Sequence, residues 1–157
     1  MFMHEIFMKE ALKLAEKAYT IGEVPVGCVI VDENDKIIGS GYNMRNIKKN
    51  SLYHAEIFAI NEACNAIEDW RLENCTLYVT VEPCPMCAGA IIQARITNVV
   101  FGTRNRKAGC AGSILNILSE NRFNHQTSIT EGILAEQCAA LMTNFFANFR
   151  NKQSINI

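Results

Sequence analysis

The chain has 157 residues, of which 49% are hydrophobic, and a formal net charge of −1. This length is typical of one domain, and no apolar run approaches the roughly 18 residues that cross a bilayer, so we expect no contact with a membrane. The first residues include an acid and no basic stretch, which argues against a secretion signal. Because the seven cysteines are odd in number and mostly isolated, they favour reduced thiols in the cytoplasm over a disulfide framework.

The apolar periodicity predicts strands that alternate with helices after an opening hairpin. The first expected elements are a helix over 2–20, a strand over 24–31, a turn at 32–35 and a hairpin partner strand that starts with residues 36–39. They are followed by a polar loop over 44–53, a helix over 54–66, a strand over 75–80, a helix over 85–94, a strand over 97–101, a basic loop over 102–112, a short helix over 114–119, a strand over 128–134 and a helix over 135–150. In the second helix, we expect Ile57, Ile60 and Cys64 to face the core. This order is typical of an α/β sandwich with a mixed sheet, and we treat residues 1–157 as one domain with a core at about 5–150 and a short tail at 151–157.

Two short motifs bring together residue types that bind zinc. The sequence H-A-E at 54–56 is followed, 27 residues after Glu56, by P-C-P-M-C at 83–87. His54, Cys84 and Cys87 supply three nitrogen and sulfur ligands, which leaves one tetrahedral position open, as in a catalytic zinc site. Glu56 then remains free to accept and donate protons for an activated water. The sequence therefore predicts a catalytic zinc centre served by Glu56.

Other interpretations of these motifs are a structural zinc site and a redox cysteine pair. A structural site needs a fourth Cys or His at metal-binding spacing, and His4 and His125 are isolated in the sequence. The prolines on either side of Cys84 and the lack of an aromatic residue before it disfavour redox use. We expect both motifs at helix N-termini, where the helix dipole favours thiolates and an ionised Glu56.

Positive charge gathers in the two segments that contain the motifs. Residues 36–55 and 83–119 have no acid, and together they hold eight basic residues: Lys36, Arg45, Lys48, Lys49, Arg95, Arg104, Arg106 and Lys107. Basic segments around a site on a nearly neutral protein indicate a polyanionic substrate such as a nucleic acid. The alternative is an ordinary solvated loop surface.

Longer stretches around these motifs resemble the bacterial tRNA-specific adenosine deaminase family. The H-x-E and P-C-x-x-C pair alone is shared by the wider class of zinc nucleobase deaminases, and the continuations M-C-A-G-A-I and V-V-F-G narrow the resemblance. It runs from about residue 5 to Arg150 and is carried by Lys107 and by the stretches at 24–27, 54–57, 76–80, 82–91, 95–96, 99–102, 112–113, 124–125 and 131–134.

This resemblance implies a cytidine deaminase-like fold, which is a three-layer α/β/α sandwich with a mixed five-stranded sheet, and a homodimer with one Zn²⁺ per subunit. It also implies that the wobble adenosine of a tRNA anticodon stem-loop is converted to inosine. Matched residue by residue, His54, Cys84 and Cys87 are the zinc ligands and Glu56 is the proton shuttle. The residues implied to bind substrate are Val26, Asn43, Ala55, Arg104, Asn105, Lys107, Phe146 and Arg150.

These substrate residues have different implied roles. Asn43 contacts the target nucleoside. Lys107 and the flanking Arg104 and Arg106 meet phosphates, and Phe146 and Arg150 form an aromatic and basic end beside the RNA. Two other functions stay open. An enzyme acting on a free base or nucleoside, such as guanine or cytosine, uses the same zinc chemistry but needs no phosphate contacts. A non-catalytic zinc module that recognises RNA has no use for Glu56.

Two places depart from the family pattern. The stretch Asn50-Ser51-Leu52-Tyr53 stands where the family usually has Asp-Pro-Thr-Ala, which changes the loop before His54 and its contacts to flanking nucleotides. Asn105 stands where the family commonly has Asp. A carboxylate there can accept a hydrogen bond from a ribose 2′-OH, which distinguishes RNA from DNA, whereas Asn keeps an acceptor without the charge. Our hypothesis is that this protein discriminates against deoxyadenosine less sharply than its relatives.

Overall fold

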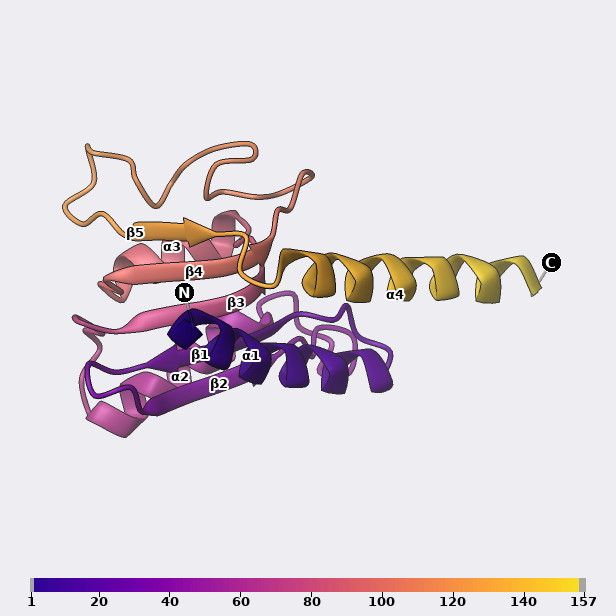
Figure 1. Ribbon diagram of the computed structural model, residues 1–157, viewed down its shortest axis with the longest axis horizontal. Helices are drawn as coiled ribbons and strands as arrows, with labels where there is room; N and C mark the ends of the chain where they lie inside the picture. The colour runs from indigo at the N-terminus through magenta and orange to yellow at the C-terminus, as the bar shows by residue number, and fades with distance from the viewer. Residues whose placement is uncertain (1, 156–157) are drawn as a thin grey trace.

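The computed structural model describes residues 2–155 and contains a central sheet between two layers of helices (Figure 1). Its elements are α1 (Phe2–Thr20), β1 (Gly27–Val31), β2 (Ile37–Tyr42), α2 (Ala55–Ile67), β3 (Thr76–Val81), α3 (Pro85–Gln93), β4 (Asn98–Thr103), β5 (Ser128–Glu131) and α4 (Ala135–Ile155). No helix within these described residues is long and apolar enough to cross a membrane.

The five strands form one mixed sheet in the order β2-β1-β3-β4-β5. Strand β1 runs antiparallel to both β2 and β3, whereas β3, β4 and β5 are parallel to one another. Helices α1 and α4 lie on one face and α2 and α3 on the other (Figure 1). The predicted α/β/α sandwich with a mixed five-stranded sheet is therefore confirmed.

Successive side chains of β1 belong in turn to the hydrophobic clusters on the two faces of the sheet. Val29 and Val31 pack with Phe7 and Met8 of α1 on one face. Cys28 and Ile30 belong to the cluster of the other face, which contains the small buried residues of α2 and α3. Successive side chains of a strand point to opposite faces, so an uninterrupted apolar strand is what a sheet covered on both sides requires.

Four element predictions differ from the structure. The first strand begins at Gly27 rather than at residue 24, because Pro25 has no N–H and the Val26 N–H closes a tight turn onto the Val24 carbonyl. Residues 114–119 form turns rather than a helix, since their N–H groups bond back to Gly109 and Cys110. The last strand ends at Glu131 rather than at residue 134. Helix α4 continues to Ile155, so the expected tail begins as helix, and its last two residues lie outside the described range.

Small residues bring α2 unusually close to β2. A Cβ placed on Gly39 would lie 2.2 Å from the Ala59 carbonyl oxygen, and one on Gly41 would lie 2.4 Å from that of Ala55. The fully buried face of α2 is accordingly Ala55, Ala59 and Ala63. Of the three residues expected to face the core, Ile60 and Cys64 are half-buried and pack against it, which confirms the prediction for them. Ile57 is also half-buried. The close contact of α2 with β2 fixes the first turn of α2.

We expect Gly41→Ala to destabilise the fold by about 3 kcal/mol, because the added methyl group must push α2 away from β2. Chemical unfolding measures the change. Gly89→Ala in α3 is the matched control: its Cβ would meet nothing within 4 Å, and alanine is the better helix former, so stability should stay equal or rise slightly. Equal stability of the two variants would contradict the close packing of α2.

Candidate active site

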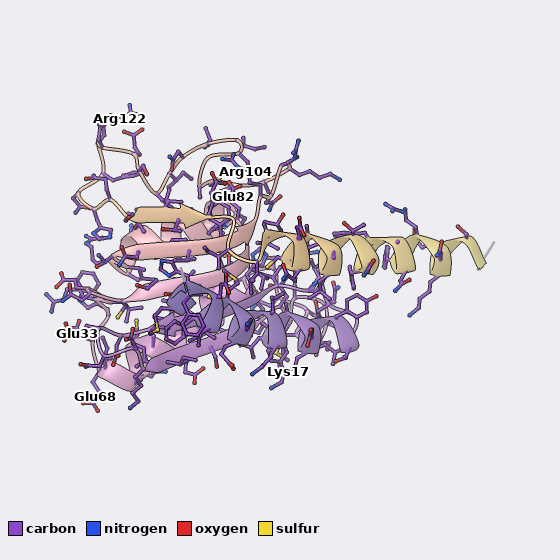
Figure 2. All side chains as sticks on the ribbon, in the orientation of Figure 1. Lys17, Glu33, Glu68, Glu82, Arg104 and Arg122 are labelled. Atoms are coloured by element: carbon purple, nitrogen blue, oxygen red, sulfur yellow. The ribbon has the colours of Figure 1, made fainter. Side chains whose placement is uncertain are left out.

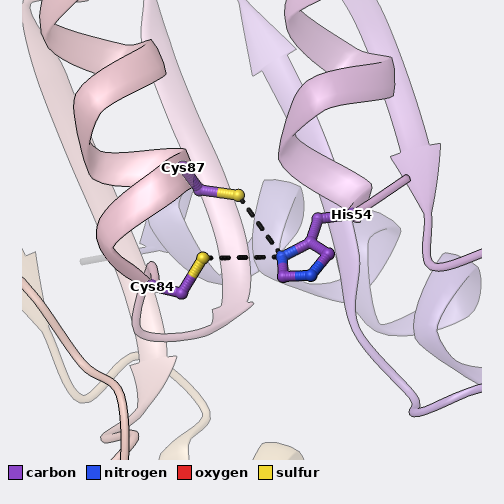
Figure 3. A group of neighbouring side chains, drawn as sticks. All are labelled: His54, Cys84 and Cys87. Carbon is purple, nitrogen blue, oxygen red and sulfur yellow. Dashed lines mark hydrogen bonds between the residues drawn. The ribbon is translucent and has the colours of Figure 1, made fainter. Parts of the chain in front are cut away.

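The three predicted ligands converge from two helix N-termini. His54 is the N-cap residue of α2, Cys84 is the N-cap residue of α3, and Cys87 lies in the first turn of α3. The His54 Nδ1 atom is 3.5 Å from the sulfur of Cys84 and 3.5 Å from that of Cys87 (Figure 3). Within the described residues, 2–155, this is the one cluster of three or more potential metal-ligand side chains.

The spacing of these atoms fits a tetrahedral zinc ion. Zinc–sulfur bonds of about 2.3 Å and zinc–nitrogen bonds of about 2.0–2.1 Å at the tetrahedral angle place the nitrogen about 3.6 Å from each sulfur. Both observed distances are 3.5 Å. Zn²⁺ accepts this donor set, and three protein ligands leave a fourth position for water or substrate. The residues present therefore fit zinc in a catalytic arrangement.

The two thiols share a proton, which separates their pKa values. The Cys87 S–H donates to Cys84, and this bond, together with one from His54, lowers the pKa of Cys84 to about 4 against the opposing effect of burial. The same bond and burial raise the pKa of Cys87. The hydrogen bond from Cys87 is the largest cause of the lowered Cys84 pKa, so the expectation that the helix dipole favours both thiolates stays a prediction. Hydrogen bonding to Cys84 also raises the pKa of His54. Metal binding requires both thiolates and so releases the shared proton.

Glu56 lies in the first turn of α2, where it is 3% exposed. Burial raises its pKa, although a contact from the Cys87 thiol works in the opposite direction. The expected ionisation of Glu56 by the helix dipole is therefore opposed by desolvation. A carboxyl group whose pKa is moved toward neutral pH can both accept and donate a proton there.

A cavity of about 130 Å³ joins Glu56 to His54 and Cys84. Three of the residues implied to bind substrate, Val26, Asn43 and Asn105, lie on its wall, which is completed by Val24, Val81, Glu82 and Met142. Ala55 is buried, and its backbone N–H donates to the Asn43 Oδ1 atom at 2.9 Å. The first turn of α2 therefore also orients the Asn43 amide.

Asn105 uses its acceptor within the protein. Its Oδ1 atom accepts a hydrogen bond from the Ala108 N–H at 3.1 Å, which leaves the Nδ2 end of the amide for a substrate. The Ala108 N–H takes one of the two lone pairs of this oxygen, and the expectation that Asn105 also accepts a hydrogen bond from the substrate stays a prediction. A second hollow of about 290 Å³ adjoins the first and shares Asn105, Val81 and Met142 with it.

The second hollow is lined by three predicted phosphate-binding residues, Arg104, Arg106 and Lys107. Arg104 already makes two ion-paired hydrogen bonds of 2.8 Å to Glu131, so part of its charge is neutralised within the protein. Arg106 and Lys107 are exposed. The hollow thus presents net positive charge beside the cavity that contains Glu56.

Other predicted residues lie farther away. Phe146 follows Met142 by one turn of α4 and is 41% exposed, and Arg150 is exposed one turn beyond it. Lys36 and Arg95 lie near the start of β2 and β4, at the end of the sheet opposite the cavity. Figure 2 shows that separation, with Glu33 at one end and Glu82 and Arg104 at the other. The basic surface near the cavity is accordingly smaller than the sequence indicated.

Two buried carboxylates have no role in the motifs: Glu82, on the wall of the cavity, and Glu23, which precedes the lining residue Val24 in the chain. Glu82, 2% exposed, accepts hydrogen bonds from the loop at 104–113, and those bonds lower its pKa although burial alone would raise it. Glu23 is buried and accepts from the Ile47 N–H at 2.7 Å, which holds the loop before His54. An acid directly after an apolar strand, as in Val81-Glu82, is the sequence signal that could have identified Glu82.

Comparisons with known proteins agree with this geometry. The family model of the cytidine and deoxycytidylate deaminase zinc-binding region matches residues 1–103. The chain is 48% identical over 153 residues to the tRNA-specific adenosine deaminase of Bacillus subtilis (strain 168). This match covers 98% of the chain and 94% of that protein. The fold and the His-Cys-Cys site thus define a zinc deaminase of the cytidine deaminase class.

Two solved structures extend the comparison. One, from a study of A-to-I editing by tRNA:A34 deaminases at the wobble position of transfer RNA, has a TM-score of 0.82 and 35% identity, and the match covers 86% of this chain and 97% of that one. The guanine deaminase of Nitrosomonas europaea has a TM-score of 0.79 at 23% identity over 91% of this chain and 84% of that one, which shows the shared fold alone. Within the deaminase class, the chain belongs to the tRNA-specific adenosine deaminase family.

Proposed function

We propose that this protein hydrolyses the wobble adenosine of a tRNA anticodon to inosine, with one zinc ion per subunit held by His54, Cys84 and Cys87. The observation that carries the proposal is the buried Glu56 on the wall of the same cavity as His54 and Cys84, in a chain of this family. A carboxylate at that place is the group that the reaction needs for its proton transfers.

Zinc held by these three side chains would supply the Lewis acidity that makes water nucleophilic near neutral pH. Glu56 accepts a proton from the attacking water and passes it to the ring nitrogen beside the amino-bearing carbon of adenine. Glu56 then moves a second proton from the newly added hydroxyl group to the amino group. The carbon–nitrogen bond breaks, ammonia leaves, and the carbonyl group of inosine forms. Burial raises the pKa of Glu56, so this carboxylate takes up a proton more readily than an exposed one would, as the transfer from water requires.

The rest of the cavity holds the nucleoside. Asn43 is fixed by the bond from the Ala55 N–H to its Oδ1 atom, so its Nδ2 group remains as a donor toward the target nucleoside. Val26 supplies an apolar wall. A side chain locked by its own hydrogen bond loses little entropy when the substrate binds, which supports the role of Asn43 in orientation.

The hollow that contains Arg106 and Lys107 supports a polynucleotide over a free base. A neutral base fits the first cavity alone, whereas a strand continues into a neighbouring hollow whose cations can meet its phosphates. We assign Lys107 and Arg106 to these phosphate contacts. We expect Arg104 to contribute less, because its guanidinium group is already paired with the Glu131 carboxylate. Phe146 and Arg150, farther along α4, would meet more distant parts of the anticodon stem-loop. A homodimer in the cytoplasm, where tRNA is modified, completes the proposal.

The test is inosine formation by the zinc-loaded protein on an anticodon stem-loop with a wobble adenosine. Free adenosine, cytidine and guanine are assayed in parallel. We expect inosine in the stem-loop and no turnover of the free compounds. Turnover of guanine, cytidine or adenosine alone would retain the zinc chemistry and reject tRNA as the substrate. Zinc and RNA binding without any turnover would indicate a non-catalytic module.

Asn105→Asp should raise the preference for RNA over DNA by about fivefold, because one carboxylate oxygen can keep the bond from the Ala108 N–H while the other accepts from a ribose 2′-OH. The measurement compares turnover of stem-loops that carry adenosine or deoxyadenosine at the target position. Asn121→Asp, at an exposed position outside both hollows, is the control and should leave the ratio unchanged. An unchanged ratio in Asn105→Asp would reject the assigned role of Asn105 in sugar discrimination.

A further inference from the structure

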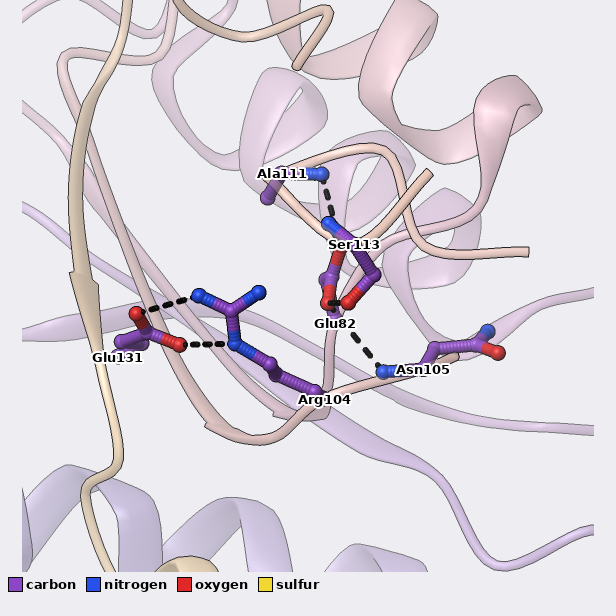
Figure 4. A network of polar contacts seen from close by, with 6 residues as sticks. All are labelled: Glu82, Arg104, Asn105, Ala111, Ser113 and Glu131. Carbon is purple, nitrogen blue, oxygen red and sulfur yellow. Dashed lines mark hydrogen bonds and ion pairs between the residues drawn. The ribbon is translucent and has the colours of Figure 1, made fainter. Parts of the chain in front are cut away.

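Glu82 is a buried carboxylate at the point where β3 ends and the approach to Cys84 begins. Its Oε1 atom accepts hydrogen bonds from the Asn105 N–H at 3.3 Å and from the Ser113 hydroxyl. Its Oε2 atom accepts from the Ala111 N–H at 3.0 Å and the Ser113 N–H at 3.1 Å (Figure 4). A carboxylate has about four acceptor positions, so the loop at 104–113 uses all of them.

These bonds connect two parts of the site that are separate in sequence. One part is the metal-binding helix, which begins directly after Glu82 and Pro83. The other is the loop at 104–113, whose Arg106 and Lys107 side chains line the second hollow. The loop is also held by the bond from the Cys110 N–H to the Pro83 carbonyl at 2.8 Å. Both anchors lie within two residues of Cys84.

Gly109 allows the loop to come this close. A Cβ at this position would lie 2.2 Å from the Glu82 Oε2 atom and 2.4 Å from the backbone oxygen of Asn105. The backbone oxygen cannot move aside without shifting the loop itself. The glycine and the carboxylate thus form a matched pair, in which the first makes room and the second binds the amides around it.

Resting on the proposed function, we propose that Glu82 is a positioning residue for the polynucleotide substrate. Its carboxylate holds the loop at a set distance from the metal-binding helix, so that the phosphate-contacting side chains and the base cavity act on one strand together. Although Glu82 borders the base cavity, its acceptors are satisfied by the loop. It therefore acts through Asn105, Arg106 and Lys107 rather than on the reacting atoms.

Glu82→Gln replaces an acceptor oxygen with an amide group that faces N–H donors, and we expect it to raise KM for the anticodon stem-loop about tenfold. The value of kcat should stay within about threefold of wild type, and zinc content should be unchanged, because the reacting groups keep their places. The logarithm of KM should also depend less steeply on the logarithm of the salt concentration. The slope should fall by the equivalent of up to about two phosphate contacts, those of Arg106 and Lys107.

The matched control is Glu62→Gln. Glu62 also accepts from the N–H and hydroxyl of one serine, Ser40, but it lies on the exposed side of α2 beside β2. Its replacement should leave KM and the salt dependence unchanged. A fall in kcat at constant KM in Glu82→Gln, or a loss of zinc, would overturn the proposal, because Glu82 would then serve the reaction or the metal instead of the loop.

Ser113→Ala decides the question if Glu82→Gln does not fold. It removes one donor to Glu82 and leaves the backbone bonds, so KM should rise about threefold at constant kcat. An unchanged KM would overturn the proposal.

Hydrogen exchange of the backbone amides at positions 111 and 113 gives a readout that is independent of substrate. Both should exchange faster in the variants than in wild type. A wild-type protein that forms no inosine would reject the proposed function, whereas unchanged exchange in the variants would reject the role of Glu82.

Discussion

Replacement of Glu56 by glutamine is expected to lower the rate of inosine formation by about 10²–10⁴-fold, the usual contribution of a general acid and base. The amide has nearly the same shape, so the packing around the buried side chain is kept, but it cannot accept and return a proton. Zinc content and the affinity for the anticodon stem-loop should stay close to wild type, because His54, Cys84 and Cys87 remain. Single-turnover assays on zinc-loaded protein measure the rate, and metal analysis measures the occupancy.

Glu136→Gln serves as the control for this change. Glu136, like Glu56, is an acid in the first turn of a helix, but it is exposed on α4. Its replacement should leave the rate unaltered, which separates the effect of the buried carboxylate from a general effect of removing a first-turn charge. If Glu56→Gln kept wild-type turnover, another group would have to move the protons. If it lost zinc, Glu56 would belong to the metal site rather than to proton transfer.

Replacement of Cys84 by alanine should remove stoichiometric zinc and lower activity by at least about 10³-fold, because Lewis acid catalysis contributes several kcal/mol. His54, Cys84 and Cys87 supply three ligands, and the two that remain after the replacement cannot hold zinc in the same geometry. Wild-type protein should melt at a higher temperature when zinc is added, since a ligand that binds the folded state stabilises it, and the variant should lose that rise.

Cys64→Ala is the control for the ligand replacement. Cys64 is half-buried in α2, and its sulfur contacts the Trp70 carbonyl at 3.7 Å rather than the three predicted zinc ligands. This variant should keep its zinc, its activity and its response to zinc in the melting experiment. Full activity in Cys84→Ala would contradict the assignment of the three ligands, because the reaction would then proceed without the predicted metal site.

Long periodic segments of this chain could be predicted from sequence, whereas short ones could not. The pattern over 2–20 identified α1 to within a residue, because an amphipathic helix of that length repeats its signal many times. Residues 114–119 carry a similar but brief pattern and form turns instead, because bonds to Gly109 and Cys110 replace the local helical bonds. In such short segments, hydrogen bonds to residues outside the segment compete with the local helical bonds and decide the structure. The local sequence pattern does not indicate these bonds.

The chemistry of the metal site was also accessible from sequence, because its parts are local. One residue separates His54 from Glu56, and two separate Cys84 from Cys87. Such short spacings keep both members of a pair at the N-cap and first turn of one helix. Once each motif was assigned to a helix N-terminus, the residue types indicated zinc and a proton carrier, and the structure brings the two pairs together.

The sequence by itself thus determined the order of the main elements and the family resemblance, and it predicted the candidate zinc ligands. Only the tertiary structure decided that Glu131 pairs with Arg104 and that Glu82 holds the loop. These partners of Glu82 and Arg104 are more than 20 residues apart in the chain. Helix periodicity and motif spacing follow from bonds between near neighbours, whereas such contacts depend on which strand ends the sheet brings to one edge.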